Sequence, residues 1–334
     1  MKTKRVLMTL ALCLVLGACS KGKKTAGKSY KIGVNQLMEH KALDDVREGF
    51  QEELKNLGVS FELDYKNAQG DVSSNSNIIA SKFAQDKVDL ILAISTPSAQ
   101  STLQATEEIP VLFSAVTDAV GSKLVKSNEK PGGNATGTID AADVKEQLEM
   151  FKKLDPKIKT IGIIYNTSES NSEVQIKEVE KYSKELGLEV KVAGINNVND
   201  LPQSLQSLVK KVDAMYLLSD NMIANSISVV TQILNENKMI SISAEESQVK
   251  GGALMTKGLS YKELGKQTAK MAKKILVDGV KPADLPVEKA EKTFLAVNKS
   301  TLKALGISEQ NEIFKDATII DQLEIGRASC RERV

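Results

Sequence analysis

Polar side chains that could bind a small charged molecule stand directly after the short apolar runs of this chain. After residues 90–94 the sequence reads Ser95-Thr96-Pro97-Ser98. Thr96 suits a helix cap and Pro97 suits the first helical turn. The free N–H groups near Ser98 would then favour an anion such as a carboxylate. An ordinary helix start has the same pattern, so the binding interpretation depends on its place at the end of a strand.

Three acidic residues follow other apolar runs and could accept an ammonium group. Asp118 comes after residues 110–115, where it could equally cap the next helix. Asp220 and Glu245 end two strands in the second half, and Asp220 could simply cap the helix that follows. A carboxylate in a closed, poorly hydrated cleft is costly unless it meets a cation. Asp220 and Glu245 are therefore candidate ammonium partners.

Amide and apolar side chains complete the candidate pocket. Tyr165 and Asn166 end the first strand of the second half, and Asn221 follows the acidic residue at 220. Met38, Phe113 and Tyr165 could form an apolar wall. Such residues more often belong to a core, so their types alone do not distinguish the two roles.

The chain lacks the residues that most catalytic and metal sites need. His40 is the single histidine, which excludes a multi-histidine zinc site. It could line the cleft, although a lone loop histidine is more often solvated or locally bonded. No G-x-S-x-G or G-x-G-x-x-G motif stands in the body of the chain. We therefore expect no catalytic residues, no metal and no cofactor.

Alternating apolar runs and amphipathic stretches predict βα units on parallel sheets. In residues 42–57, for example, Val46, Phe50 and Leu54 recur at helical spacing and should cover one sheet face. The predicted strands cover residues 30–35, 59–65, 88–94, 110–115, 161–165, 188–193, 212–218, 239–243 and 253–256. The predicted helices cover residues 42–57, 74–86, 97–106, 144–153, 171–186, 202–210, 222–236 and 261–278.

An internal repeat indicates two similar lobes. Gly33 and Gly162 mark the first strand of each half, and Gly58 and Gly187 end the helix that follows. Both pairs are 129 residues apart. Ligands of open α/β sheets bind beyond the carboxyl ends of the strands. Two facing lobes would therefore place the polar loops along one cleft, which a hinge can close.

We expect the two ends of the chain to lie outside the fold. Residues 1–18 combine basic residues with an apolar run too short to span a bilayer, which is typical of an export signal. Cys19 follows Leu16-Gly17-Ala18, a pattern that resembles a bacterial lipobox and predicts lipidation of Cys19. Residues 19–29 have the composition of a flexible tether. Residues 324–334 resemble a translated sequencing adapter, and we treat them as an artefact.

Charge and cysteine content exclude further classes. Cys13 lies in the signal and Cys330 in the tail, which leaves only the lipidated Cys19. The whole chain has 45 basic and 43 acidic residues. The signal contains three basic residues and the tail three basic and two acidic ones, so 39 and 41 remain, a net charge of −2. A nucleic-acid partner is therefore not expected.

The body of the chain resembles the ABC-transporter substrate-binding lipoproteins of the tryptophan/tyrosine type. The resemblance covers residues 31–305 and is carried by seven stretches: IGVNQLMEHKALD, ISTPSAQS, VLFSAVTDAVGSKLV, GGNATGT, IGIIYNTSESNS, VDAMYLLSDN and LGKQTAKMAKKIL. It implies the type I periplasmic-binding-protein fold, in which two Rossmann-like α/β lobes with parallel sheets are joined by a three-strand hinge. The implied crossings lie near residues 115–140, 256–260 and 283–295. Lobe 1 would comprise 30–138 and 258–285, and lobe 2 would comprise 139–257 and 290–322.

The resemblance implies a monomeric receptor on the outer side of the cell membrane, anchored through Cys19, that passes a small molecule to an ABC permease. An aromatic or other apolar amino acid is the expected ligand. The implied ligand contacts are Ser95, Thr96, Ser98, Asp118, Tyr165, Asn166, Asp220, Asn221 and Glu245. The alternatives are a receptor for a sugar, a nucleoside or another solute, and a sensory lipoprotein without a transport role. An enzyme is disfavoured by the missing motifs.

Overall fold

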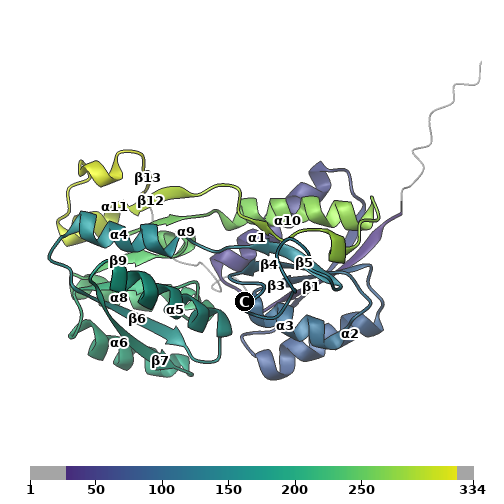
Figure 1. The fold of residues 1–334 in the computed structure, drawn as a ribbon, viewed down its shortest axis with the longest axis horizontal. Helices are drawn as coiled ribbons and strands as arrows, with labels where there is room; N and C mark the ends of the chain where they lie inside the picture. The colour runs from purple at the N-terminus through teal and green to yellow at the C-terminus, as the bar shows by residue number, and fades with distance from the viewer. Residues whose placement is uncertain (1–27, 322–334) are drawn as a thin grey trace, which may run out of the picture.

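Two β-sheets, each covered by helices, lie side by side in the computed structural model, which describes residues 28–321 (Figure 1). The first sheet is parallel throughout, in the order β11-β5-β4-β3-β1-β2. Its strands are β1 (Tyr30–Gln36), β2 (Phe61–Asn67), β3 (Leu90–Ile94), β4 (Val111–Val116), β5 (Ala135–Ile139) and β11 (Glu288–Lys289). Its helices are α1 (Lys41–Asn56), α2 (Asn77–Gln85), α3 (Thr96–Ala105) and α10 (Tyr261–Leu276). We call this unit lobe 1.

Lobe 2 is built on a second sheet in the order β13-β12-β10-β9-β8-β6-β7, parallel except between β10 and β12. Its strands are β6 (Thr160–Asn166), β7 (Glu189–Ile195), β8 (Ala214–Leu217), β9 (Ile240–Ser243), β10 (Met255–Gly258), β12 (Phe294–Asn298) and β13 (Thr318–Ile320). Its helices are α4 (Val144–Leu154), α5 (Ser170–Glu185), α6 (Leu201–Val209), α7 (Asn221–Asn225), α8 (Ile227–Glu236), α9 (Glu246–Lys250) and α11 (Lys299–Leu305).

The chain passes between the lobes three times. It leaves lobe 1 after β5 to form α4, returns after β10 to form α10, and leaves again from β11 to β12. The crossing segments are therefore residues 140–143, 259–260 and 290–293. Each is short, so rotation of one lobe against the other is confined to a few backbone positions.

The sequence repeat corresponds to a structural one. In lobe 1, β1 lies between β3 and β2, and in lobe 2, β6 lies between β8 and β7. Gly58 and Gly187 follow α1 and α5, the helices after β1 and β6, with φ of 70° and 64°. A residue with a side chain is strained in this left-handed region, whereas glycine adopts it freely. The sequence therefore ends both helices at the predicted place.

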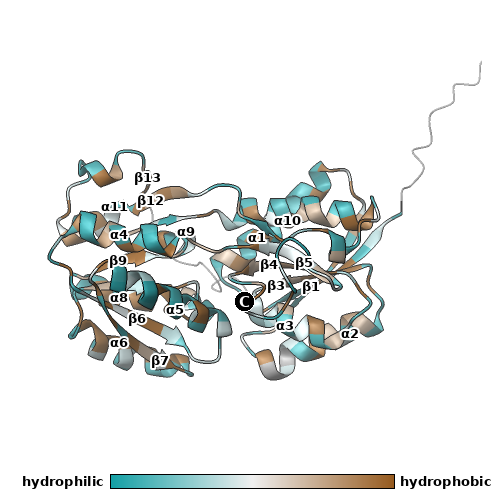
Figure 2. Cartoon of the chain, in the orientation of Figure 1, coloured by the Kyte–Doolittle hydropathy of each residue, from teal (hydrophilic) through white to brown (hydrophobic). Residues whose placement is uncertain are grey.

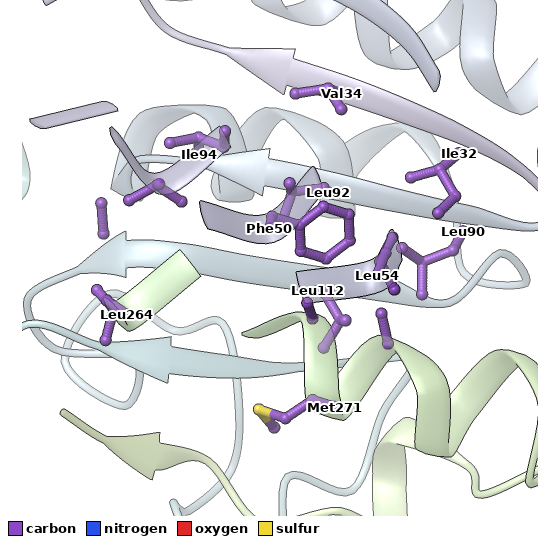
Figure 3. Close-up of a cluster of buried hydrophobic side chains, with 14 of the residues drawn as sticks. Ile32, Val34, Phe50, Leu54, Leu90, Leu92, Ile94, Leu112, Leu264 and Met271 are labelled. Atoms are coloured by element: carbon purple, nitrogen blue, oxygen red, sulfur yellow. The ribbon is translucent and has the colours of Figure 1, made fainter. Parts of the chain in front are cut away.

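The core of lobe 1 forms between its sheet and the helices on its face. Val46, Phe50 and Leu54 of α1 are fully buried, as the helical spacing predicts. Phe50 and Leu54 lie among sheet residues that include Leu90 and Leu92 (Figure 3). The helices have both hydrophilic and hydrophobic residues (Figure 2), and the central strand β3 is apolar and fully buried. Burial of these apolar faces is the main contribution to the stability of each lobe.

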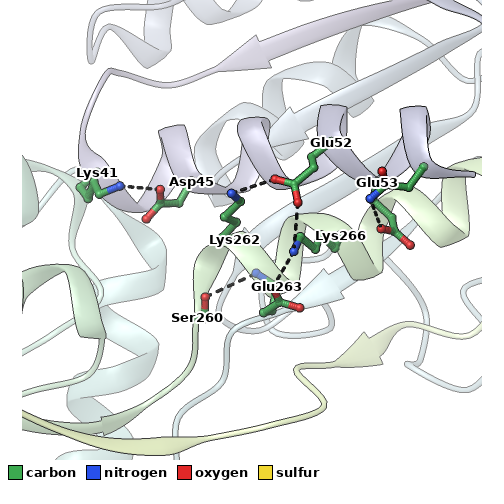
Figure 4. Close-up of polar contacts among 9 residues, drawn as sticks. Lys41, Asp45, Glu52, Glu53, Ser260, Lys262, Glu263 and Lys266 are labelled. Atoms are coloured by element: carbon green, nitrogen blue, oxygen red, sulfur yellow. Dashed lines mark hydrogen bonds and ion pairs between the residues drawn. The ribbon is translucent and has the colours of Figure 1, made fainter. Parts of the chain in front are cut away.

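Helices α1 and α10 pack unusually close because each has a glycine at the contact. A Cβ added to Gly49 would lie 2.1 Å from the carbonyl oxygen of Lys262, and one added to Gly265 would lie 2.1 Å from that of Val46. At the surface of this contact, Glu52 pairs with Lys262 at 2.8 Å and with Lys266 at 3.3 Å (Figure 4). The packing fixes the starts of both helices, which point toward lobe 2.

Several elements differ from the predicted ones. The helix expected over residues 222–236 is divided into α7 and α8 at Ser226. The sequence reading also missed β5, β11, β12, β13, α9 and α11. β5 was missed because its ATGTI sequence has no continuous apolar run. Its buried threonines satisfy their hydroxyls internally, since the Thr136 hydroxyl lies 2.6 Å from the Leu285 carbonyl oxygen.

Several predictions concern parts of the chain that lie outside the described residues. These are the export signal at 1–18, lipidation of Cys19, most of the tether at 19–29 and the adapter-like tail at 324–334. The first described residue, Lys28, pairs with Asp89 at 2.8 Å. Within residues 28–321 no helix combines the length and the apolar character needed to cross a membrane.

Candidate functional site

A cavity lies between the lobes, where helices from both begin. The free volume of the cavity is only about 20 Å³, so the opposite walls are close together. The cavity is at the carboxyl ends of the strands, where α/β sheets bind ligands. The lining residues are His40, Ala42, Leu43, Thr96, Ala115, Thr117, Asp140, Asn171, Ser219, Asp220, Asn221, Ala224, Glu245 and Tyr261.

Four of the sequence-predicted contacts line this cavity: Thr96, Asp220, Asn221 and Glu245. Thr96 is the first residue of α3 and is buried. The preceding Ser95 has φ of 103°, and Ala115 on the cavity wall has φ of 55°. Such backbone strain in residues other than glycine costs about 1–3 kcal/mol each and concentrates at functional sites. The cavity therefore has a mark of function besides its position.

The other predicted contacts do not line the cavity. The Ser95 hydroxyl caps α3 by accepting from the Ser98 N–H at 3.3 Å, and both residues are buried. Phe113 is fully buried in a hydrophobic core cluster of lobe 1. Met38 packs against another core cluster of that lobe, and Tyr165 packs against a core cluster of lobe 2.

Asp118 and Asn166 serve their own loops. One Asp118 oxygen accepts from the N–H groups of Val120 at 3.0 Å and Gly121 at 2.8 Å, so this carboxylate caps a turn. Of the two roles the sequence allowed for Asp118, the structure has a cap, though of a turn and not of a helix, and ligand contact stays a prediction. Asn166 donates its N–H to Asp220 at 2.7 Å and its amide group to Glu169 at 3.3 Å. Asn166 thus supports residues of the cavity wall from behind.

Sequence reasoning did not select several residues of the wall, notably Asp140, Asn171 and Tyr261. Asp140 follows β5, a strand that the sequence analysis did not predict. The only sequence feature that could have identified Asp140 is its place near a predicted crossing between the lobes. Asn171 and Tyr261 lie in the first turn of α5 and α10. Helix starts that follow a strand end face the cleft in such folds, and that rule could have identified them.

Three acidic residues of lobe 2 stand at helix starts beside the cavity. Glu169, Asp220 and Glu245 are the residues that precede α5, α7 and α9, and each is at most 3% exposed. The partial positive charge of a helix N-terminus stabilises a carboxylate there. This local arrangement explains how lobe 2 tolerates several buried carboxyl groups in one place.

The carboxyl of Asp220 is held by lobe 2 itself. One oxygen accepts from the Asn166 N–H and from the Ser172 hydroxyl, both at 2.7 Å, and the other accepts from the Ile223 N–H at 3.0 Å. Burial nevertheless raises its pKa above the ordinary value. Both oxygens have protein donors, so Asp220 has mainly a structural role at the cavity wall.

Glu169 and Glu245 have strongly raised pKa values. Burial raises the pKa of Glu169 to about 7, and the nearby Asp220 charge adds to the effect. Glu169 accepts hydrogen bonds from the N–H groups of Asn221 at 3.1 Å and Met222 at 3.2 Å. Burial also raises the pKa of Glu245 to about 7, against the opposing hydrogen bond from the Ser247 hydroxyl at 2.8 Å. Burial thus favours the neutral form of both carboxyl groups more than water does.

Two crossing segments bring Asp140 and Tyr261 together. The Tyr261 hydroxyl donates to one Asp140 oxygen at 2.6 Å, and both residues are buried. Burial raises the pKa of Asp140, and burial followed by the Asp140 charge raises that of Tyr261. Tyr261 therefore stays protonated and remains a donor to Asp140.

One hydrogen bond spans the cavity from lobe to lobe. His40 Nε2 of lobe 1 lies 3.1 Å from Asn221 Oδ1 of lobe 2. Burial lowers the pKa of His40 to about 4, so the imidazole is neutral at pH 7. A neutral histidine can join the lobes without adding charge to the cavity.

The acidic groups have no basic partner within residues 28–321. The ion pairs of this part of the chain involve none of Asp140, Glu169, Asp220 and Glu245. No group of three or more metal-ligating side chains occurs there either. A ligand cation would supply the charge that these carboxyl groups lack.

Comparison with known proteins identifies the family. The profile of the family described as ABC transporter substrate binding protein matches residues 31–320. The chain belongs to this family. A protein of Clostridioides difficile strain R20291 named tyrosine-binding protein is 43% identical over 297 residues, which cover 87% of this chain and 86% of that protein. Substrate-binding proteins of ABC transporters act outside the cytoplasm and bind solutes without converting them, so this family member is not an enzyme.

Two solved structures show the same fold and differ in how well they superpose. The ABC domain of Streptococcus pneumonia in complex with L-Trp is 33% identical, with a TM-score of 0.82 over 86% of this chain and 100% of that one. The ligand-free, open structure of a Clostridium difficile substrate-binding protein with adhesive properties is 43% identical, with a TM-score of 0.68 over 88% and 99%. The less similar sequence superposes better, so the lobes of this protein are arranged more as in the L-Trp complex.

Proposed function

We propose that this protein is a lipid-anchored receptor that captures an aromatic amino acid outside the cytoplasm and delivers it to the permease of an ABC importer. The observation that carries the proposal is the interlobe cavity, whose buried carboxyl groups lack a basic partner within residues 28–321. An amino acid has the ammonium group that such a wall favours. The relatives named for tyrosine and bound to L-Trp support the choice of side chain.

The polarity of the cavity wall supports a ligand that has both charged and apolar parts. In this arrangement of the lobes the free volume is only about 20 Å³, roughly the space of one water molecule, so the walls must separate to admit a ligand. Ala42, Leu43 and Ala224 supply apolar surface, and Tyr261 supplies an aromatic ring. A neutral sugar or nucleoside would leave the carboxyl groups without a cation. These alternatives are therefore weaker than an amino acid.

Capture requires the lobes to open and close. The narrow walls leave little free space in the present arrangement, so a ligand must enter while the cleft is wider. Rotation at the three crossing segments would then enclose it. Family membership supports delivery to a permease, and the lipobox-like sequence that ends at Cys19 supports anchoring.

Thermal unfolding of the purified protein with each of the twenty amino acids tests this proposal, with sugars and nucleosides as controls. A micromolar ligand at millimolar concentration stabilises the folded protein by about 4 kcal/mol. We expect the midpoint to rise with Trp, Tyr or Phe. A rise with a sugar or nucleoside alone, or with no amino acid, would refute the proposed ligand class.

Two further measurements test capture and transport. Small-angle scattering should give a smaller radius of gyration at ligand saturation, because the lobes close. An unchanged radius would contradict a closing receptor. Uptake of the labelled ligand should fall in cells that lack this protein and recover when it is restored; unchanged uptake would contradict delivery to an importer.

A further inference from the structure

Three buried acceptor atoms of the cavity wall form no hydrogen bond within residues 28–321. They are His40 Nδ1, Asp140 Oδ1 and Asn171 Oδ1. Asp140 is 5% exposed and Asn171 is 3% exposed. Buried polar atoms without a partner are rare in proteins, since each costs about 1–3 kcal/mol. Three of them around one cavity indicate a ligand that brings hydrogen-bond donors.

The hydrogen bonds of Asn221 determine which proton His40 has. The Asn221 amide nitrogen donates to Glu169, so its oxygen faces His40. His40 Nε2 must therefore donate to that oxygen. A neutral imidazole has one N–H group, and its other nitrogen is an acceptor. His40 Nδ1 consequently offers a lone pair and no proton.

Asp140 and Asn171 are also held in place, because the other polar atom of each carboxyl or amide group is hydrogen-bonded to the protein. The second oxygen of Asp140 accepts from the Tyr261 hydroxyl at 2.6 Å. The Asn171 amide nitrogen donates to the Ser219 carbonyl oxygen at 2.9 Å and to Glu169 at 3.3 Å. These bonds leave Asp140 Oδ1 and Asn171 Oδ1 as acceptors with fixed positions. Such pre-organisation lowers the entropic cost of binding a ligand.

The charge around the three acceptors favours a cation. Asp140 has a negative charge when ionised, and Glu245 lies on the same wall. No lysine or arginine lines the cavity within the described part of the chain. The oxygens of Asp220 already accept from lobe 2 donors, so this carboxylate is poorly placed to bind a ligand directly.

We propose that His40 Nδ1, Asp140 Oδ1 and Asn171 Oδ1 together bind the ammonium group of the ligand. A primary ammonium has three N–H donors, one for each acceptor. His40 belongs to lobe 1, Asp140 to a crossing segment and Asn171 to lobe 2, so all three reach one ammonium only when the lobes are closed. This inference rests on the proposed amino-acid ligand. It identifies the ammonium as the ligand group that the closed lobes recognise.

Isosteric ligand analogues test the ammonium site without adding bulk. The probes are L-Tyr and L-Trp, each compared with its α-hydroxy acid, in which a hydroxyl replaces the ammonium group. Calorimetry at pH 7.5 should show at least about 100-fold weaker binding of the hydroxy acid, because charge and two donors are lost. Equal affinity of the two compounds would overturn the ammonium site while leaving the amino-acid receptor intact. Failure of both compounds to bind would instead refute the proposed ligand class.

Variants then test whether the three residues produce the preference of the protein for the amino acid over the hydroxy acid. Asp140→Asn keeps the shape and removes the charge, and it should reduce the preference for amino acid over hydroxy acid from about 100-fold to about 10-fold. Asn171→Ala and His40→Ala should each reduce it by a smaller factor. General damage to the fold would weaken both compounds equally and leave the ratio unchanged.

The matched control is Asp143→Asn, three residues from Asp140. Asp143 is exposed, and its side chain caps α4 by accepting from the Glu146 N–H at 3.0 Å, a role that asparagine also performs. This variant should retain the full preference. A wild-type ratio in all three cavity variants would overturn the proposal.

Discussion

Replacement of Glu245 by Gln should make the ligand-free protein more stable at alkaline pH. Burial of Glu245 disfavours its ionised form and raises its pKa from 4.5 to about 7. The folded protein therefore holds this proton more tightly than the unfolded chain does. The carboxyl imposes no cost below about pH 4.5, and its cost grows as the pH rises to about 7 and stays constant above that. A glutamine side chain at this position would have nearly the same shape without the charge.

The expected size of the effect follows from the pKa. A change from 4.5 to about 7 corresponds to roughly 3 kcal/mol of lost stability at pH 8. Opening of the lobes would hydrate Glu245 and reduce this figure, so it is an upper value. For a chain of this size, roughly 3 kcal/mol changes the unfolding midpoint by about 5 °C.

The assay is thermal unfolding by circular dichroism at pH 5 and pH 8 without ligand. Glu245→Gln should unfold at a higher temperature than the wild type at pH 8 and at a similar temperature at pH 5. Glu309→Gln is the matched control, because Glu309 is exposed and the change there should matter little at either pH. Equal midpoints at pH 8, or a difference that is the same at both pH values, would refute the reasoning.

Three other predictions concern packing, anchoring and pH. Gly49→Ala should lower the free energy of unfolding by about 1–3 kcal/mol in urea titrations, since the added Cβ meets the Lys262 carbonyl oxygen at 2.1 Å. Gly133→Ala is the control, because Gly133 has open space around it. Similar losses of stability in both variants would contradict close packing as the cause. Cys19→Ala should abolish incorporation of labelled fatty acid and release the protein from membranes; persistent labelling would exclude Cys19 as the lipidation site. Ligand affinity should fall about 20-fold from pH 7.5 to pH 5.5, because protonation of Glu245 removes a charge that attracts the ammonium; calorimetric affinity that is independent of pH would exclude this coupling.

The sequence predicted the βα units well where the apolar pattern was continuous. The helical spacing of Val46, Phe50 and Leu54 matches a buried face of α1. The pattern failed at β5, whose alternating threonines are buried. Their hydroxyls are satisfied by distant partners; Thr138, for example, lies 2.9 Å from the Ser114 hydroxyl and 2.8 Å from that of Thr268. No local rule predicts a buried threonine whose partner comes from 130 residues away.

The candidate site was predicted in part for a similar reason. Thr96, Asp220, Asn221 and Glu245 follow strands that the sequence makes obvious, and all four line the cavity. A position directly after a strand shows at which edge of the sheet a residue lies. It does not distinguish a ligand contact from a side chain that caps its own loop or helix. Asp118 illustrates the difference, because its oxygen accepts from its own turn.

The sequence by itself determined the two-lobed α/β plan, the family and the edge of each sheet that faces the cleft, because apolar periodicity and helix-ending glycines act over short distances. Only the tertiary structure decided which side chains meet across the cleft. His40 and Asn221 are 181 residues apart, and Asp140 and Tyr261 are 121 apart, yet each pair is hydrogen-bonded. Burial between the lobes also raises the pKa of Glu245 and lowers that of His40. Burial depends on the packing of both lobes, so it has no signature in the residues next to either group.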